Sequence, residues 1–356
     1  MIDFLIIGGG IAGVSAAARL SALGSVTLLE GEDALAYHTS GRSAAMFEQN
    51  YGKPSTIPLN KASHAFHDQA DVLSPRGLLL VGNADTADAF ATDARQMQLA
   101  QISMQEAKDM VPILDDAAVD RTAYHEAAWD IDTDKLIQCF ARTARENGAA
   151  IHTKTHVDDI KRNSKGWVVS AGTVTFEAQN LVNAAGAWVD QIATLAGIAP
   201  LGFTPLRRSM ARIPAPGGHD VSTWPMMFGP GENWYAKADA GALIVSPAEE
   251  DATTPHDAYA DDMVLAEGLA RYEANVTEPV TRLLSSWAGL RTFSPDRTLV
   301  LGPDAQDPNF IWCAGQGGYG MQSAPAASQL LADLISGGPS DLPVDAITAL
   351  SPQRFT

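Results

Sequence analysis

Three glycines and one carboxylate near the start of the chain have residue types and a spacing suited to binding a dinucleotide. Gly8, Gly10 and Gly13 form a G-x-G-x-x-G pattern, and Glu30 lies 17 residues after Gly13. In this pattern the first glycine permits a tight turn, the second lets the backbone approach a pyrophosphate, and the third lets a helix pack closely on a strand. The carboxylate then accepts hydrogen bonds from ribose hydroxyls. A glycine-rich surface turn alone would not explain Glu30.

The flanking sequence supplies the elements that this chemistry needs. Residues Phe4–Ile7 form a short apolar run, Ala-rich helical sequence extends to Leu23, and Val26–Glu30 is a second apolar run that ends on the carboxylate. Strand, glycine turn, helix, strand is the order of a βαβ dinucleotide site, in which the helix N-terminus faces the phosphates. The first thirty residues therefore predict a bound dinucleotide.

A second glycine turn lies near the other end of the chain. Phe310–Ala314 is an apolar run, Gly315–Gln322 is glycine-rich, and Ala-rich helical sequence continues to Ile335. This is again a strand that enters a glycine turn at a helix N-terminus. We expect the first and last elements to form two walls of one cofactor cleft.

The length and composition of the chain indicate how many domains it forms and which partners it binds. The chain has 356 residues, of which 46% are apolar, so two domains with sizeable cores are expected. Lys and Arg total 24 against 42 Asp and Glu, and the net charge is −18. A chain this acidic repels phosphate backbones, so nucleic acid is not expected as a partner. The acidity is equally consistent with an adaptation of solubility or habitat.

Cysteine usage and apolar runs indicate the compartment. Cys139 and Cys313 are the only cysteines and show no pairing pattern, which favours a reducing compartment. The first strand begins within about three residues of the N-terminus and leaves no room for a signal peptide. No run reaches the roughly 18 apolar residues of a membrane span. We expect a soluble, cytoplasmic protein without a transmembrane segment; peripheral membrane contact stays open.

Local patterns predict the remaining elements. Strand patterns, helical patterns and turn residues alternate along the chain. The expected strands are Arg76–Val81, a ribbon over Ile151–Phe176, Leu181–Gly186 and several stretches within 206–250, and the expected helices are Ser55–Ala70, 84–115, Lys135–Asn147 and 260–285.

Several short motifs, spread over nearly the whole chain, occur in an order typical of one family. After the N-terminal glycine pattern they are Tyr37–Ala45, Ile131–Asp134, Asn183–Trp188, Arg207–Ser209, Trp287–Arg291 and Gln316–Gly320. Together they resemble the FAD-dependent D-amino-acid oxidase superfamily, and most nearly the bacterial D-arginine dehydrogenase and D-amino-acid dehydrogenase group. FAD is favoured over NAD, also because the small residues and Arg42 between Ser40 and Ala45 can approach a diphosphate and an isoalloxazine edge.

The resemblance implies an α/β fold with two interleaved domains. An FAD-binding, Rossmann-like domain is expected from residues 1–80, 135–205 and 286–356. A substrate-binding domain of α+β type, with a mixed sheet above the flavin, is expected from 81–134 and 206–285.

The resemblance also assigns cofactor-binding positions. FAD is expected to be non-covalent, because Cys313 lies in an apolar strand and His38 is the only other residue near the flavin loop that could attach it. Backbone N–H groups of Gly317 through Met321 are expected to stabilise negative charge on the reduced flavin. The implied FAD-binding residues are Gly8, Gly10, Ala12, Gly13, Glu30, Gly31, Thr39, Ser40, Gly41, Arg42, Ser43, Ala44, Ala45, Met46, Val157, Gly186, Gly317, Gly318, Tyr319, Gly320 and Met321.

The reaction implied by the resemblance is oxidative deamination. A hydride passes from the substrate Cα to flavin N5, and the imino acid hydrolyses to a 2-oxo acid and ammonia. Arg291 is expected to hold the substrate carboxylate through two parallel hydrogen bonds, with Arg208 as a second cation unless adjacent Arg207 is the inward one. No side chain is assigned as general base, because the amine can lose its proton to solvent. The implied substrate-site residues are Tyr51, Arg208, Tyr235, Arg291, Gly318 and Gln322.

Two positions depart from the D-arginine dehydrogenase pattern. Met46 stands where those enzymes have a histidine, and Leu78 stands where they have a glutamate that pairs with the cationic side chain. Without a carboxylate there, burying a guanidinium is strongly unfavourable. Glu48 could compensate, but its direction is not given by the sequence. We therefore predict a neutral or apolar D-amino acid, with proline, sarcosine or a similar cyclic or N-methylated amino acid as second choice.

Other functions remain as alternatives. A flavin-dependent 2-hydroxy acid dehydrogenase would need a base for the hydroxyl proton, and Met46 replaces the most obvious one. A non-catalytic FAD-binding subunit would give no reason for Arg291, Tyr51 and Tyr235 to occur together. The electron acceptor is open among a quinone, a carrier protein and oxygen. No metal is expected, because no third ligand accompanies His64 and His67, interpreted as two exposed helix histidines.

Overall fold

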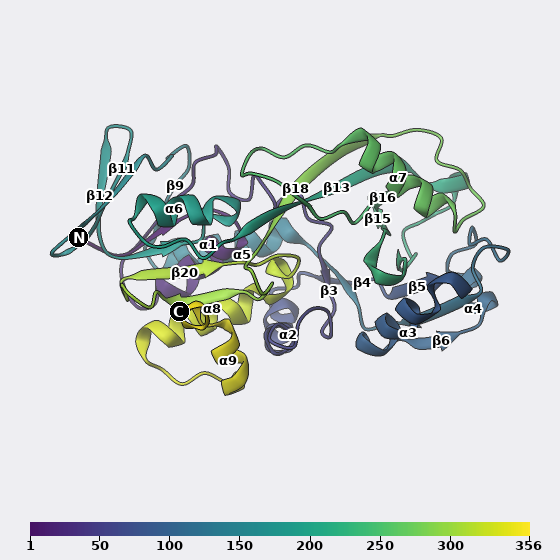
Figure 1. The fold of residues 1–356 in the computed structure, drawn as a ribbon, viewed down its shortest axis with the longest axis horizontal. Helices are drawn as coiled ribbons and strands as arrows, with labels where there is room; N and C mark the ends of the chain where they lie inside the picture. Colours follow the sequence, from purple (N-terminus) through teal and green to yellow (C-terminus); the bar gives the residue numbers. More distant parts are fainter.

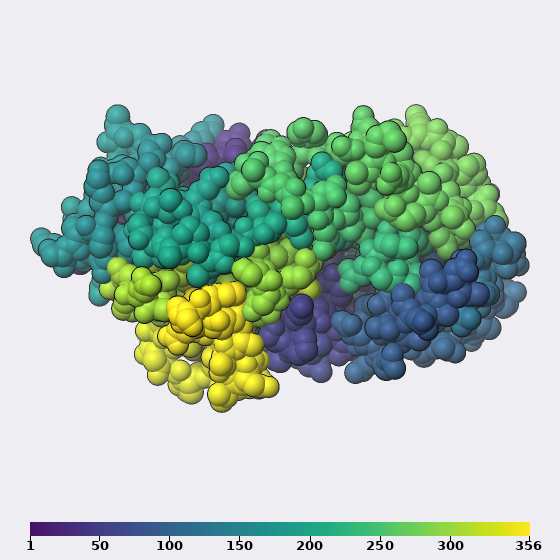
Figure 2. Space-filling view, viewed as in Figure 1, coloured from purple at the N-terminus to yellow at the C-terminus, as the bar shows by residue number.

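Two large sheets lie side by side along the long axis of the molecule. The computed structural model describes residues 1–356. Figure 1 shows one sheet with its helices at the end that carries both chain termini, and the other sheet with α3, α4 and α7 at the opposite end. Figure 2 shows the same elongated outline. In the middle of this view, purple segments from the N-terminal part of the chain adjoin yellow-green segments from its C-terminal part.

The first sheet contains the glycine turn of the N-terminal motif. Its central strand pairs in parallel with its two neighbours, as in a doubly wound fold. The apolar run of this strand is buried between helices on both sides, which explains why it has no polar alternation. The sheet has eight strands in the order β10 (Asp159–Asn163), β11 (Gly166–Ala171), β12 (Val174–Asn183), β1 (Ile2–Ile7), β2 (Val26–Leu29) and β9 (Ala150–His152), with β20 (Phe310–Ala314) beside β12 and β19 (Val300–Pro303) beside β20.

The second sheet is mixed and has nine strands. Most neighbours are antiparallel, and β14 and β5 are parallel. The order is β17 (Asp251–Ala252), β13 (Thr204–Pro214), β16 (Ala242–Ser246), β15 (Tyr235–Asp239), β14 (Met226–Phe228), β5 (Leu78–Gly82), β7 (Arg121–His125) and β6 (Ala100–Ile102), and β18 (Ser285–Phe293) pairs with β13.

A small third sheet and the helices complete the fold. The third sheet has the order β3 (Met46–Phe47), β8 (Trp129–Ile131) and β4 (Leu73–Pro75). Apolar faces of α1, α5 and α8 enclose the largest core together with the first sheet. The helices are α1 (Ile11–Leu20), α2 (Ile57–Gln69), α3 (Ala87–Gln96), α4 (Met104–Met110), α5 (Thr133–Glu146), α6 (Val189–Leu195), α7 (Asp262–Glu273), α8 (Gly320–Ser336) and α9 (Val344–Leu350).

The predicted α/β class with a Rossmann-like sheet and a second, mixed sheet is confirmed. Two helical predictions were too long. Within 84–115 the chain forms an edge strand, β6, between α3 and α4, and α7 ends at Glu273 rather than near 285. Pro279 follows that end, and proline lacks the N–H that a continuing helix requires.

The larger sheet draws strands from both sides of the predicted domain boundaries. β5 lies mostly within 1–80 and β18 mostly within 286–356, yet both belong to the nine-stranded sheet. The division into two domains at these boundaries stays a prediction. None of the helices combines the length and the apolar character that crossing a membrane requires.

Candidate active site

The N-terminal glycine turn has the close packing that its pattern predicts. Gly8 has a φ of +109°, a conformation that favours glycine, and a Cβ on Gly13 would collide with the carbonyl oxygen of Gly8. At Gly10, by contrast, a Cβ would approach only the Ser40 hydroxyl, at 3.1 Å. The turn is therefore closed on the sheet side and leaves a cradle at Gly10, where α1 begins. This arrangement fits the pyrophosphate of a dinucleotide.

Glu30 lies directly beside this turn. Its Oε2 accepts a hydrogen bond from the N–H of Gly9 at 2.6 Å, and its Oε1 accepts one from the N–H of Glu32 at 2.9 Å. The carboxylate follows the end of β2, as the pattern predicts. Its contact with a ribose stays a prediction.

A cleft extends from the glycine turn to the larger sheet. It encloses about 1520 Å³, including the part open to solvent. It brings together most of the sequence-predicted site residues: Gly10, Ala12, Thr39, Ser40, Arg42, Ser43, Ala44, Ala45, Met46, Tyr51, Gly186, Arg208, Tyr235, Arg291, Gly317, Gly318, Gly320, Met321 and Gln322.

Seven predicted residues do not line the cleft. Gly8 and Gly13 shape the turn from behind, and Tyr319 packs its ring against Tyr51, with the ring centroids 5.5 Å apart. The other four are Glu30, Gly31, Gly41 and Val157, of which Val157 belongs to an apolar core of the first sheet.

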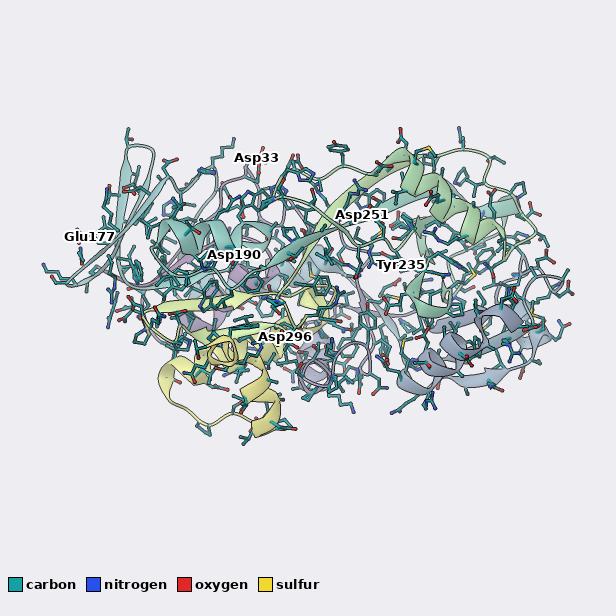
Figure 3. All side chains as sticks on the ribbon, in the orientation of Figure 1. Asp33, Glu177, Asp190, Tyr235, Asp251 and Asp296 are labelled. Carbon is teal, nitrogen blue, oxygen red and sulfur yellow. The ribbon has the colours of Figure 1, made fainter.

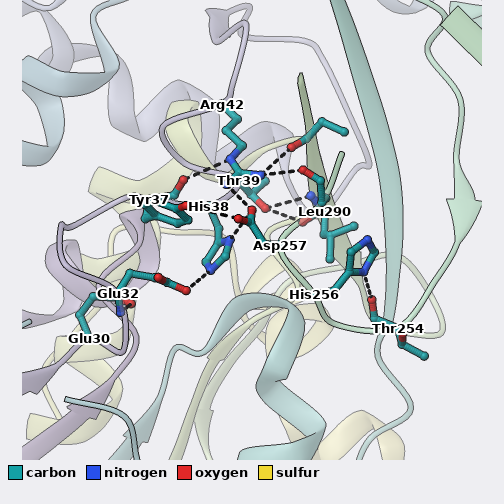
Figure 4. A network of polar contacts seen from close by, with 12 residues as sticks. Glu30, Glu32, Tyr37, His38, Thr39, Arg42, Thr254, His256, Asp257 and Leu290 are labelled. Carbon is teal, nitrogen blue, oxygen red and sulfur yellow. Dashed lines mark hydrogen bonds and ion pairs between the residues drawn. The ribbon is translucent and has the colours of Figure 1, made fainter. Parts of the chain in front are cut away.

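Arg42 is held by protein groups in a network with a distant loop. Its Nη1 donates to the carbonyl oxygens of Ala258 and Ala288 at 2.9 and 3.0 Å, and its Nη2 donates to Asp257 at 2.5 Å (Figure 4). Thr39 adds a hydrogen bond from its hydroxyl to the carbonyl oxygen of Leu290 at 2.8 Å. We expected Arg42 to approach a diphosphate. In the structure its guanidinium is bound by Ala258, Ala288 and Asp257, and Arg42 is also a lining residue of the cleft.

The second glycine turn has fewer free N–H groups than expected. The N–H of Gly317 donates to the carbonyl oxygen of Thr292 at 3.0 Å, and that of Tyr319 donates to Gln316 at 2.8 Å. Of the five consecutive N–H groups that we expected to face the flavin, those of Gly318, Gly320 and Met321 therefore remain as candidates.

Arg208 and Arg207 are neighbours on β13 but lie on opposite faces. Arg208 is 4% exposed and lines the cleft, whereas Arg207 pairs with Asp251 at 2.7 Å outside it. Side chains alternate along a strand, so only one of the two faces the site. Figure 3 shows Asp251 and Tyr235 on the larger sheet. The sequence left the choice between the arginines open, and the structure resolves it in favour of Arg208.

Two guanidinium groups, those of Arg208 and Arg291, line the cleft, and that of Arg208 has unfilled donors. Nε and Nη1 of Arg208 are buried without a hydrogen-bond partner, and Nη2 lies 3.3 Å from Glu250. Burial first, and then the positive charge of Arg291, lower the pKa of Arg208. A Cβ on Gly318 would lie 3.1 Å from Nη1 of Arg291. Buried donors and two like charges make this space complementary to an anion such as a carboxylate.

Two tyrosines flank the arginine pair. The hydroxyl of Tyr51 donates a hydrogen bond to Glu232 at 3.0 Å. The hydroxyl of Tyr235 lies 3.3 Å from the sulfur of Met210. Burial, followed by the charge of Glu232, raises the pKa of Tyr51, so its hydroxyl stays a donor at neutral pH. Sequence reasoning missed Glu232: it follows a Pro-Gly turn, which carries no sign of a site, and it has a left-handed φ of 53°.

Gln322 and Glu48 are polar residues of the cleft lining. The backbone N–H of Glu48 donates to Oε1 of Gln322 at 3.1 Å, and Nε2 of Gln322 is buried without a partner. Burial raises the pKa of Glu48 to about 7. Met46 and Leu78 line the same cleft, and Met97 is an apolar lining residue that no local pattern indicated.

The interpretation of His67 as an exposed helix residue was wrong. Its side chain is completely buried, and Nε2 lies 2.9 Å from the carbonyl oxygen of Gln322. Burial lowers the pKa of His67 to about 4, so the imidazole is neutral at physiological pH. His67 therefore supports the first turn of α8 from behind the cleft.

Comparison with known proteins identifies the family. The sequence matches the FAD dependent oxidoreductase family (DAO) over residues 3–334, and the chain belongs to this family. A glycerol 3-phosphate dehydrogenase from Caloramator mitchellensis is 24% identical over 94% of this chain and 74% of its own length. FAD is thus the expected cofactor, in agreement with the cradle at Gly10 and the two glycine turns.

Solved structures show the same fold. Glycine oxidase from Geobacillus kaustophilus superimposes with a TM-score of 0.82 and 21% identity, covering 98% of both chains. L-proline dehydrogenase from P. horikoshii superimposes with a TM-score of 0.83 and 22% identity, covering 99% of this chain and 97% of its own. The predicted superfamily is confirmed. The narrower resemblance to D-arginine dehydrogenase is not shown by these relatives.

Proposed function

We propose that this protein is an FAD-dependent dehydrogenase or oxidase that oxidatively deaminates a small amino acid, with D-amino acids as the preferred enantiomers. The observation that carries the proposal is the meeting of Arg208 and Arg291 beside Gly318, with donors of Arg208 unfilled. An α-carboxylate supplies two acceptor oxygens to such a pair, and a guanidinium binds it in two parallel hydrogen bonds.

The residues around Arg208 and Arg291 contact the different parts of the proposed substrate. Tyr51 and Tyr235 add hydroxyl groups on the carboxylate side, and the carbonyl oxygen of Gly318 is available to the amine. Apolar side chains of the larger sheet, Leu78 among them, keep water from the Cα–H and favour the neutral amine. Bound FAD supplies the two-electron acceptor for the hydride that leaves Cα. Hydrolysis of the released imino acid then yields a 2-oxo acid and ammonia.

Anaerobic reduction of the FAD-loaded protein tests this proposal. The flavin band at ~450 nm is followed with D- and L-amino acids, N-methyl amino acids, 2-hydroxy acids and glycerol 3-phosphate. We expect bleaching by amino acids, fastest with D enantiomers. Bleaching only by 2-hydroxy acids or the polyol phosphate would replace amine oxidation with alcohol oxidation. Bleaching by none of these compounds would contradict an enzymatic role in this class.

A further inference from the structure

Three buried polar groups in or behind the cleft wall lack hydrogen-bond partners. Oε2 of Glu48, Nε2 of Gln322 and Nε2 of His125 are all buried and unpaired. Glu48 is 5% exposed and Gln322 is 3% exposed, and both line the cleft. His125 lies behind Glu48, with its Nε2 at 3.7 Å from Oε1. Unpaired buried polar groups cost free energy, so this cluster fits an occupant that pairs with them.

Glu48 and Gln322 lie close along the chain to Tyr51 and Gly318, which adjoin Arg291. Glu48 precedes Tyr51 by three residues, which is at most about 10 Å of extended backbone. Tyr51 reaches Gly318 and Arg291 with its hydroxyl, whereas Glu48 lies beside His125, the cross-strand partner of Leu78. Arg208 and Arg291 thus approach the cleft from β13 and β18, whereas Glu48 lies beside β7, the neighbour of β5.

Part of the cleft wall is apolar. Leu78, Met97, Met226 and Phe228 line it. An amino acid held by its carboxylate at Arg291 would pass an apolar stem along this wall before it reached Glu48. The sequence predicted a neutral side chain and left the direction of Glu48 open. The structure places Glu48 in the cleft lining with Oε2 unpaired, which favours a side chain that ends in an N–H donor instead.

We propose that Glu48 and Gln322 determine the substrate class, by accepting amino acids whose side chain has an apolar stem and ends in a nitrogen that is protonated or carries N–H. This inference rests on the proposed amino-acid oxidation. A terminal ammonium donates to the free Oε2 of Glu48, and its charge offsets that of the carboxylate. Glu48 is ionised more readily beside such a cation, which compensates for its burial.

A matched pair of unreactive carboxylates tests the inference without turnover. ε-Aminocaproate is lysine without its α-amine, and caproate is the same chain without the terminal nitrogen. We expect the FAD-loaded protein to bind ε-aminocaproate at least about tenfold more tightly than caproate, measured by perturbation of the flavin spectrum. Glu48→Gln removes the charge with little change of shape and should abolish most of this preference. Glu249→Gln is the control, because Glu249 is a buried carboxylate that does not line the cleft.

Flavin reduction by lysine and norleucine gives the second arm. The wild-type protein should be reduced faster by lysine than by norleucine, and Glu48→Gln should lose this ratio, whereas Glu249→Gln should keep it. Equal binding of the two carboxylates in the wild type, or a preference that survives Glu48→Gln, would overturn the role of Glu48. If Glu48→Gln instead abolished reduction by both amino acids, Glu48 would act on the reacting amine and the specificity role would be overturned. Reduction by no amino acid at all would overturn the proposed function and this inference together.

Discussion

The hydroxyl of Tyr51 donates a hydrogen bond to Glu232 at 3.0 Å, and both residues line the cleft. Burial lowers the pKa of Arg291, but Tyr235 and Tyr51, followed by the charges of Glu232 and Glu250, outweigh burial and leave this pKa raised. Glu232 therefore supplies an internal negative charge to the two arginines when no substrate carboxylate is bound. A substrate carboxylate must compete with it.

Removing this internal charge should strengthen carboxylate binding. Glu232→Gln is expected to lower the Kd for caproate several-fold, because the arginine pair then faces Glu250 as its remaining nearby carboxylate rather than two. Titration of the flavin spectrum measures the Kd, and Glu267→Gln on the exposed face of α7 is the control. Weaker binding by Glu232→Gln would show that Glu232 organises the site rather than competes for it.

Binding of a carboxylate by Arg208 and Arg291 should depend on the geometry of the guanidinium groups and not only on their charge. Arg291→Lys and Arg208→Lys keep one positive charge but lose the paired donors, so kcat/KM for the best amino acid should fall on the order of 100-fold in each. Arg207→Lys, on the opposite face of β13, should lose less than about threefold. Comparable losses in all three variants would contradict the assignment of the inward arginine.

The N-terminal turn should not tolerate a methyl group at Gly13. A Cβ there collides with the carbonyl oxygen of Gly8, which moves either α1 or the turn. Gly13→Ala should therefore purify with little or no FAD and a lower Tm. Gly338→Ala, where a Cβ would approach only the flexible Ser336 hydroxyl at 3.3 Å, should keep its FAD. Full FAD content in Gly13→Ala would place the cofactor away from this turn.

Glu48 should make the stability of the ligand-free protein fall as pH rises. Its pKa is raised from 4.5 to about 7, so between these values the folded state holds a proton that the unfolded state has lost. The free energy of unfolding should decrease over this window by an amount on the order of 3 kcal/mol at most. The effect is fully expressed above pH 7.

Glu48→Gln isolates that contribution. His67 titrates in the same range with the opposite sign, because its folded pKa is lowered to about 4, but it is present in both proteins and cancels in the difference. Lys61 and His125, the other ionisable neighbours of Glu48, cancel likewise. Denaturant unfolding at pH 5 and pH 8 gives the comparison. A difference between wild type and variant that does not change with pH would mean that Glu48 is not a buried acid.

Local motifs were sufficient to predict the parts of the site that are contiguous in sequence. The turn at Gly8 to Gly13, its carboxylate Glu30 and the second turn before α8 each combine a strand, glycines and a helix N-terminus within a few residues. Arg208 could be narrowed to one of two adjacent positions, because strand alternation requires a known sheet face to decide between them.

The rest of the site depends on long-range pairing that no local pattern reports. Glu232 reaches Tyr51 from 181 residues away, through the position of the Pro230–Glu232 turn beside β5 and α3. Met97 reaches the cleft from the end of α3. The position of His67 along α2 does not by itself show that the side chain is buried. Its burial follows from the packing of α2 on α8. Each of these contacts is set by which elements become neighbours.

The central claim is that the cleft holds an amino acid with its Cα–H positioned for transfer to the flavin. Anaerobic single-turnover reduction of the FAD-loaded protein by an amino acid, with protium or deuterium at Cα, measures this step directly. The account predicts full bleaching of the flavin at a rate several-fold slower with deuterium, and a loss of that bleaching in Arg291→Lys. A flavin that remains oxidised with every amino acid, yet is reduced by a 2-hydroxy acid or a polyol phosphate, would contradict it.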